Sequence, residues 1–218
     1  MARPFQAVVF DNDGLLLDTE VTWTRAQERL WRRHGQSFTP EHKRALIGSS
    51  RTAAAAMMES MLDQPGGGER LVDEVYDLVM EEALKGVDPR PGAMELLSAL
   101  DSEGMPLAVA SNSARKFVER VLEGAGLLDG PFRHVVTADD VARPKPAPDL
   151  YLAACSALDA DPTRSAALED SPPGVESAAA AGLYVIGVPY FPGTPLPRAS
   201  LLARSLSDEP VRAALGLG

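Results

Sequence analysis

Short apolar runs alternate with helical patterns along most of this chain, and this alternation narrows the possible folds more than any other property. Each run ends abruptly at polar or turn residues, as buried strands do. We predict strands at Phe5–Phe10, Pro106–Ala110, His134–Thr137, Ala166–Leu168 and Leu183–Val188. Helical patterns lie between the later runs, at Ala93–Leu100, Ala114–Leu122, Asp149–Leu158 and Val175–Ala181. The alternation predicts an α/β protein with a doubly wound parallel sheet, whose ligands bind outside the C-terminal ends of the strands.

Residues 20–87 break this alternation, because helical patterns fill the interval and no convincing strand pattern occurs there. The patterns cover Glu20–Arg33, Glu41–Leu46, Thr52–Leu62 and Leu71–Leu84. The segment Asp88-Pro89-Arg90-Pro91-Gly92 then marks the return to the alternating part, since proline cannot continue a helix internally. We therefore predict an inserted α-helical domain at residues 19–87 and an α/β core formed by residues 1–18 and 88–218.

Charge, cysteine content and the lengths of apolar stretches indicate which partners and which location this chain has. The chain has 31 acidic and 21 basic residues and a formal net charge of -10, which disfavours nucleic acid as a partner. Its one cysteine, Cys155, cannot form an internal disulfide and fits the apolar pattern around it. Asp11 follows too soon for a signal-peptide core, and no apolar stretch reaches the roughly 18 residues of a membrane span. We predict a cytoplasmic protein without a membrane partner.

Two carboxylates follow the first predicted strand. Asp11 and Asp13 are two residues apart, so in an extended segment both side chains point the same way. Such a pair can hold a divalent cation, or can act as nucleophile and general acid. A capped, solvated turn is an equally good interpretation of Asp-Asn-Asp-Gly by itself. An EF-hand is excluded, because Leu15 and Leu16 occupy positions where that loop needs a ligand and a glycine.

Three other strand ends carry groups that a phosphate site needs. Ser111, in Ser-Asn-Ser, offers a hydroxyl next to a helix N-terminus, and Lys145 is a cation between two prolines. Glu169 and Asp170 are adjacent acids that can complete an oxygen shell around magnesium. Each has an ordinary alternative as a helix N-cap or a surface lysine. Together with the Asp pair, they predict one phosphate- and metal-binding site at the edge of the sheet.

These residues resemble the four ordered motifs of the haloacid dehalogenase superfamily of phosphohydrolases, and the resemblance spans nearly the whole chain. The motifs match Asp11-Asn12-Asp13-Gly14, Ser111, Lys145 and Glu169-Asp170. The helical insert after the first motif, with Arg143–Asp149 and Leu168–Ser171, resembles the branch that contains β-phosphoglucomutase and small sugar-phosphate phosphatases. The resemblance implies a Rossmann-like core with an α-helical cap.

The resemblance also implies the chemistry. Asp11 attacks phosphorus to give an aspartyl-phosphate, while Asp13 protonates the leaving alkoxide and later activates water. Lys145 and Mg²⁺ offset the charge on the transferring oxygens. The implied metal ligands are the side chains of Asp11 and Asp170, the backbone carbonyl of Asp13, and Glu169 directly or through water.

Substrate contacts follow from the same resemblance. Ser111 and the backbone amides near Asn12, Asp13 and Asn112 are expected to hold phosphate oxygens. In the cap, Gly48-Ser49-Ser50-Arg51 resembles a substrate-contacting loop, with Arg51 suited to a carboxylate or a second phosphate. A solvated arginine at a helix start is the alternative for Arg51.

Trp23 is a departure from the mutase branch, which has at this position a histidine implicated in cap closure. Tryptophan at this position favours simple hydrolysis over a mutase. Trp23 also fits the core of a cap domain.

The resulting hypothesis is a Mg²⁺-dependent phosphatase for a small phosphorylated metabolite, such as a sugar, polyol or glycolate phosphate. A hexose phosphomutase of the β-phosphoglucomutase type and a non-catalytic Mg²⁺- and phosphate-binding regulatory protein are the alternatives. The acid at Asp13 opposes the superfamily's dehalogenase activity. Analogy to many relatives of this branch favours a monomer.

Overall fold

The computed structural model describes residues 3–47 and 49–218, which form two compact units. One unit combines the N-terminal segment up to Asp18 with Asp88–Gly218, and the other is Thr19–Val87.

The first unit is built on a parallel sheet with strand order β3-β2-β1-β4-β5-β6. The strands are β1 (Val8–Phe10), β2 (Leu107–Ser111), β3 (Phe132–Thr137), β4 (Ala166–Glu169), β5 (Tyr184–Gly187) and β6 (Leu201–Leu202). The predicted parallel α/β sheet is therefore confirmed, with β6 as an additional edge strand. β1 and β4 are buried on both faces, which explains why β1 is apolar throughout and β4 is apolar up to its last residue, Glu169.

The position of β1 determines where functional groups can meet. Val8 pairs with Leu107 of β2 on one side and with Ala166 of β4 on the other, and all these strands run parallel. The chain crosses from one side of β1 to the other between β3 and β4, so β1 is the point where strand order reverses. In open α/β sheets, ligands bind at the carboxyl ends of the strands at such a point.

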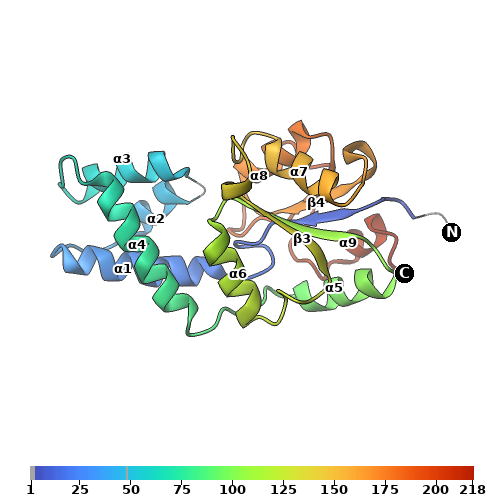
Figure 1. The fold of residues 1–218 in the computed structure, drawn as a ribbon, viewed down its shortest axis with the longest axis horizontal. Coiled ribbons are helices and arrows are strands. Elements are labelled where there is room, and N and C mark those ends of the chain that lie inside the picture. The colour runs from blue at the N-terminus through green and yellow to red at the C-terminus, as the bar shows by residue number, and fades with distance from the viewer. Residues whose placement is uncertain (1–2, 48) are drawn as a thin grey trace. The chain divides into compact units, whose positions relative to one another are not determined.

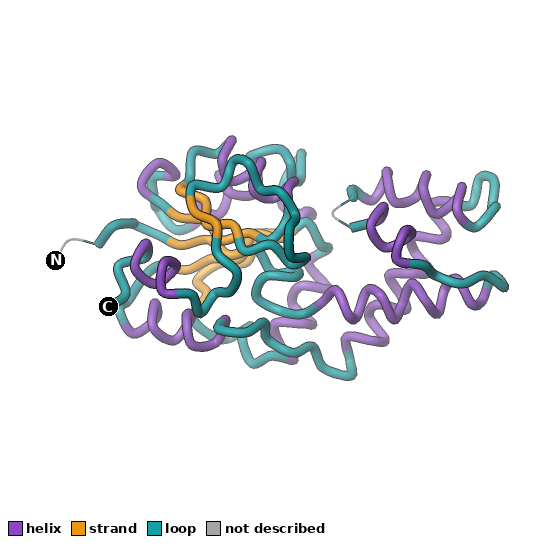
Figure 2. The backbone as a smooth tube through the Cα atoms, turned by 180° about the vertical axis from the view of Figure 1, so that it is seen from behind, coloured by secondary structure: helices purple, strands orange, loops and turns teal. Residues whose placement is uncertain are grey.

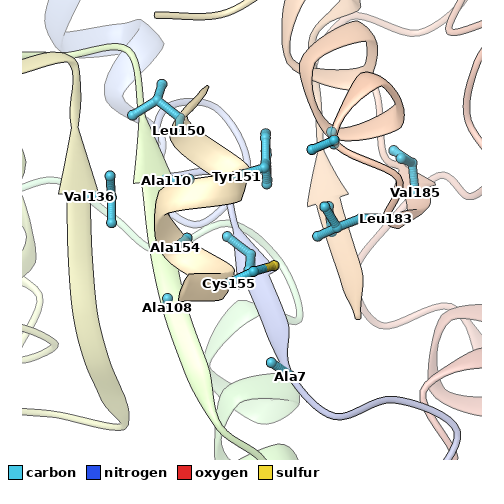
Figure 3. Packing of buried hydrophobic residues seen from close by; sticks show 14 of the residues in the cluster. Ala7, Ala108, Ala110, Val136, Leu150, Tyr151, Ala154, Cys155, Leu183 and Val185 are labelled. Carbon is cyan, nitrogen blue, oxygen red and sulfur yellow. The ribbon is translucent and has the colours of Figure 1, made fainter. Parts of the chain in front are cut away.

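Helices cover both faces of this sheet. They are α5 (Ala93–Ser102), α6 (Arg115–Gly124), α7 (Asp149–Ala157), α8 (Pro172–Ala180) and α9 (Glu209–Ala214), with the short 3-10 helices η1 (Ala138–Asp140) and η2 (Pro162–Arg164). Figure 1 shows α7 and α8 on one face and α5 and α9 on the other. Small strand residues such as Ala108 and Ala110 let α7 pack closely on the sheet, where Cys155 is buried among them (Figure 3). Burial raises the pKa of the Cys155 thiol to about 11, as expected for an unreactive core cysteine.

The second unit contains helices and loops over its described residues (Figure 2). The helices are α1 (Thr19–Arg33), α2 (Pro40–Leu46), α3 (Arg51–Met61) and α4 (Gly68–Ala83). α4 packs against both α1 and α3 through an apolar face that includes Leu71, Val75 and Leu78. Side chains of Thr39 and Ser50 cap the amino ends of α2 and α3, which sets where these helices begin. None of the helices in the described part of the chain has the length and apolar character needed to cross a membrane.

Candidate active site

The predicted motif residues of the first unit meet at the carboxyl ends of adjacent strands. Asp11 directly follows β1, Ser111 is the last residue of β2, and Glu169 is the last residue of β4. Lys145 lies in the loop between η1 and α7. Because β1 lies between β2 and β4, these ends are neighbours in space although they are far apart in sequence.

Lys145 connects the buried groups of this site. Its Nζ donates to Asp11 Oδ1 at 2.5 Å, to Glu169 Oε1 at 2.7 Å and to the Ala110 carbonyl at 2.8 Å. Burial alone would lower the pKa of Lys145, but the carboxylates of Asp11 and Glu169 raise it above its ordinary value. Asn112 fixes the lysine backbone, because its side chain accepts from the Lys145 amide at 2.8 Å and donates to the Lys145 carbonyl at 3.2 Å. The site therefore contains a buried lysine whose charged form is favoured by two neighbouring carboxylates.

Asp11 is in a different electrostatic state. Its side chain is buried, and desolvation raises its pKa well above the ordinary value even though Lys145 acts in the opposite direction. The negative charges of Glu169 and Asp13 raise the pKa further. In the metal-free protein, ionised Asp11 is thus costly, and a bound cation would favour its charged form.

The Asp13 carboxyl group is held by serines of the β2 end. Its Oδ2 accepts from Ser111 Oγ at 2.8 Å and from Ser113 Oγ at 2.9 Å, and its Oδ1 accepts from Asn12 Nδ2 at 3.2 Å. A hydroxyl has one hydrogen, so Ser111 cannot donate to a phosphate oxygen while it donates to Asp13. Ser113, whose contact with Asp13 the sequence did not indicate, is a further residue of this site.

A cluster of acids beside Lys145 could bind a metal ion. Asp11, Glu169 and Asp170 are all buried, and each offers a carboxylate oxygen within 4.8 Å of the others. Such an all-oxygen donor set fits a hard divalent cation such as Mg²⁺. Gly14 adjoins the cluster with φ of +83°, and a Cβ there would lie 2.4 Å from Asp170 Oδ2. Glycine at this position thus permits both the left-handed backbone and the close approach of Asp170.

Tyr151 and Gly174 complete the surroundings of Glu169, and sequence reasoning missed both. Tyr151 Oη donates to Glu169 Oε1 at 2.6 Å, and its pKa is raised well above the ordinary value by burial and by Glu169. A Cβ on Gly174 would lie 1.9 Å from Glu169 Oε1, so only glycine leaves room for this carboxylate. For Tyr151, the available signal was a hydroxyl-bearing aromatic in the largely apolar stretch 150–158.

The predicted substrate contacts of the insert lie in the second unit. Trp23 on α1 makes an edge-on ring contact with Tyr76 of α4, with centroids 5.1 Å apart. Arg51, the first residue of α3, donates to Glu69 at 3.1 Å and to Asp73 at 2.7 Å, and it lies over the Tyr76 ring. Gly48 lies outside the described residues. Arg51 thus has carboxylate partners within its own unit.

Comparison with known proteins adds independent evidence. The family model described as haloacid dehalogenase-like hydrolase matches residues 8–188. A validoxylamine A 7'-phosphate phosphatase of Streptomyces hygroscopicus subsp. limoneus is 34% identical over 185 residues, covering 84% of this chain and 85% of that protein. A (DL)-glycerol-3-phosphatase of Arabidopsis thaliana is 34% identical over 191 residues, covering 84% of this chain and 63% of that protein. This chain thus spans less than two thirds of the plant protein.

A solved structure shares the fold over nearly the whole chain. CbbY from Rhodobacter sphaeroides, in complex with phosphate, superimposes with a TM-score of 0.83 and is 27% identical, covering 98% of this chain and 100% of that one. The sequence comparisons therefore indicate the family of this chain, and the structural comparison agrees with its fold.

Proposed function

This chain belongs to the haloacid dehalogenase-like hydrolase family, and from this premise we propose that it is a Mg²⁺-dependent phosphatase acting on a small phosphorylated metabolite through an aspartyl-phosphate. The observation that carries the proposal is the buried set of Asp11, Glu169 and Asp170 around one possible cation position, with Lys145 bonded to two of these acids. Sugar, polyol and glycolate phosphates are the proposed substrate class. The similarity to phosphatases for validoxylamine A 7'-phosphate and glycerol 3-phosphate supports a phosphomonoester substrate.

Asp11 is the proposed nucleophile. The carboxylate oxygen of Asp11 that does not accept from Lys145 attacks phosphorus in line. A bond from Asp11 to phosphorus forms while the bond from phosphorus to the leaving oxygen breaks. When bound, Mg²⁺ supplies positive charge that favours ionised Asp11 and offsets the charge of the phosphoryl oxygens. Lys145 contributes the same kind of stabilisation from a fixed position, because three acceptors hold its Nζ in place.

Asp13 is the proposed general acid and base. It gives its proton to the leaving alkoxide in the first half-reaction and takes one from water in the second, which returns Asp11 and releases phosphate. The hydroxyls of Ser111 and Ser113 orient the Asp13 carboxyl group. When substrate binds, Ser111 is able to turn its hydrogen to a phosphate oxygen, because Ser113 continues to donate to Asp13.

The helical unit is the proposed cap, which excludes water and sets substrate specificity. Trp23, Gly48 and Arg51 are its proposed substrate contacts. An anionic group of a substrate would have to compete with Glu69 and Asp73 for Arg51. This competition favours a substrate whose non-phosphate part is uncharged, such as a sugar or polyol.

The test is phosphate release from a panel of sugar, polyol and glycolate phosphates, with Mg²⁺ or with excess chelator. We expect Mg²⁺-dependent release by the wild type and none by Asp11→Asn, which keeps the size of the side chain but removes the nucleophilic charge. Release that persists in Asp11→Asn would contradict the proposed nucleophile. A folded wild type that isomerises a hexose phosphate only when given a sugar bisphosphate would be a mutase instead. Binding of Mg²⁺ and phosphate without any turnover would indicate a regulatory protein.

A further inference from the structure

Tyr151 is a buried polar residue at the site to which the proposed mechanism assigns no task. It lies on α7 and belongs to the buried apolar cluster that this helix forms with the sheet (Figure 3). Its side chain has no exposed surface, yet its hydroxyl reaches the carboxyl end of β4, where it donates to Glu169 Oε1 at 2.6 Å. Core packing alone does not explain why the hydroxyl of a buried tyrosine donates to one carboxylate oxygen of the acidic cluster.

Glu169 is held from both sides. Oε1 accepts from Tyr151 and from Lys145 Nζ at 2.7 Å, while Oε2 accepts from the Asp170 amide at 3.1 Å and from Ser171 Oγ at 3.2 Å. The backbone of Gly174 closes the remaining space beside this carboxylate. The orientation of Glu169 is therefore determined by its donors.

Lys145 divides its hydrogen bonds between Asp11 and Glu169, so the donors of Glu169 also affect Asp11. With the Tyr151 hydroxyl present, Glu169 Oε1 has a second donor and does not depend on the lysine alone. Without it, the buried charge of Glu169 would be compensated on that oxygen by Lys145 only. The lysine would then be drawn towards Glu169 and away from Asp11.

We propose that Tyr151 is a positioning residue, whose hydroxyl fixes the Glu169 carboxylate and thereby keeps Lys145 shared with Asp11 in the geometry that a divalent cation requires. This inference rests on the proposed function. Groups that orient metal ligands in this way typically change metal affinity or activity by about 10- to 100-fold when removed. A tyrosine that only fills the core would be replaced by phenylalanine without such an effect.

The experiment compares Tyr151→Phe with Tyr184→Phe in the full-length protein. Both changes remove one hydroxyl and keep the ring. Tyr184, however, begins β5 opposite Ala166, the first residue of β4, and so lies at the amino ends of the strands, away from Glu169.

Calorimetric titration with Mg²⁺ in the absence of substrate measures metal affinity directly. For Tyr151→Phe we expect Kd for Mg²⁺ to rise about 10-fold or more. We also expect kcat to fall by a similar factor, with KM for the substrate within about twofold of the wild type. Tyr184→Phe should match the wild type in all three.

A double-mutant cycle with Glu169→Gln tests whether the effect passes through Glu169. If it does, adding Tyr151→Phe to Glu169→Gln should weaken Mg²⁺ binding little further. Additive losses, a wild-type Kd in Tyr151→Phe, or a Tyr151→Phe protein that fails to fold would each overturn the positioning role. These outcomes differ from failure of the proposed function, in which the wild type itself neither binds Mg²⁺ nor releases phosphate and the positioning role fails with it.

Discussion

Lys145 in the first unit and Arg51 in the second each pair with two carboxylates, but their surroundings differ. The Lys145 side chain is 3% exposed and its partners Asp11 and Glu169 are buried, whereas Arg51 is 47% exposed and its partners Glu69 and Asp73 more so. Buried charges have lost their hydration and need fixed partners, while exposed pairs are hydrated and screened. The same number of ion pairs therefore gives a rigid site in one unit and an adaptable surface in the other.

The largest expected effect is that of Lys145→Ala. Removing this cation leaves Asp11 and Glu169 without their shared partner and takes away a fixed charge beside the transferring phosphoryl group. We expect phosphate release to fall by at least about 100-fold. The protein should still unfold cooperatively, because a buried carboxyl group can take up a proton.

The matched control is Lys116→Ala on α6, whose lysine is exposed. Initial rates of phosphate release and thermal unfolding by circular dichroism check both variants. A Lys145→Ala enzyme with the rate of Lys116→Ala would show that the buried pairs of Lys145 are only structural.

Much of the first unit could be predicted from the sequence, because its site residues lie at or after the ends of predicted strands. Asp11, Ser111 and Glu169 directly follow predicted strands, and Lys145 lies in the loop after another. Parallel strands bring such positions to one edge of the sheet. The strand β6 and the helix α9 were not predicted, because elements of two and six residues carry no readable periodicity.

Contacts that depend on how helices pack could not be predicted. Tyr151 occupies an apolar position of α7, and only the packing of that helix brings its hydroxyl to Glu169. Arg51 is similar, since its partners Glu69 and Asp73 lie on α4, a different helix of its unit. A single sequence shows which residue types are present near a site but not the side-chain partners chosen across two packed elements.

Gly174→Ala is expected to have the next largest effect, because it tests how rigid the buried region is. The added Cβ would meet the Glu169 carboxylate, which is itself fixed by several donors. We expect the free energy of unfolding to fall by about 1–3 kcal/mol. Urea denaturation measures the change.

The control for this prediction is Gly124→Ala at the end of α6, where an added Cβ meets nothing within 4 Å. This change should be neutral or stabilising by up to about 1 kcal/mol. Equal stabilities of the two variants would mean that Glu169 can move away freely, contrary to the rigid geometry inferred here.

A smaller effect is expected for Asp11→Asn in chelator-treated protein. Burial raises the pKa of Asp11, so its contribution to stability is present below the ordinary pKa of an aspartate and is lost as pH rises through the folded-state pKa. The neutral asparagine avoids that loss. We expect its melting temperature to exceed that of the wild type at neutral pH, with the difference shrinking towards pH 4. A lower melting temperature of Asp11→Asn at neutral pH would contradict the unfavourable burial of this charge.

The smallest effect is expected for Arg51→Gln, which breaks two exposed ion pairs. Exposed pairs contribute about 0.2–1 kcal/mol each and often nothing measurable, so breaking these two should lower the free energy of unfolding by about 2 kcal/mol at most, and by less than Gly174→Ala does. If the surface around Arg51 sets specificity, the ranking of substrates by kcat/KM should nevertheless shift. The largest fall in kcat/KM should occur for substrates with a second anionic group.

Arg44→Gln, which breaks an exposed pair with Glu41 on α2, is the control and should leave the ranking unchanged. A loss of stability as large as that of Gly174→Ala would show that Arg51 is held as firmly as Lys145, and would remove the contrast between a rigid core and an adaptable helical unit.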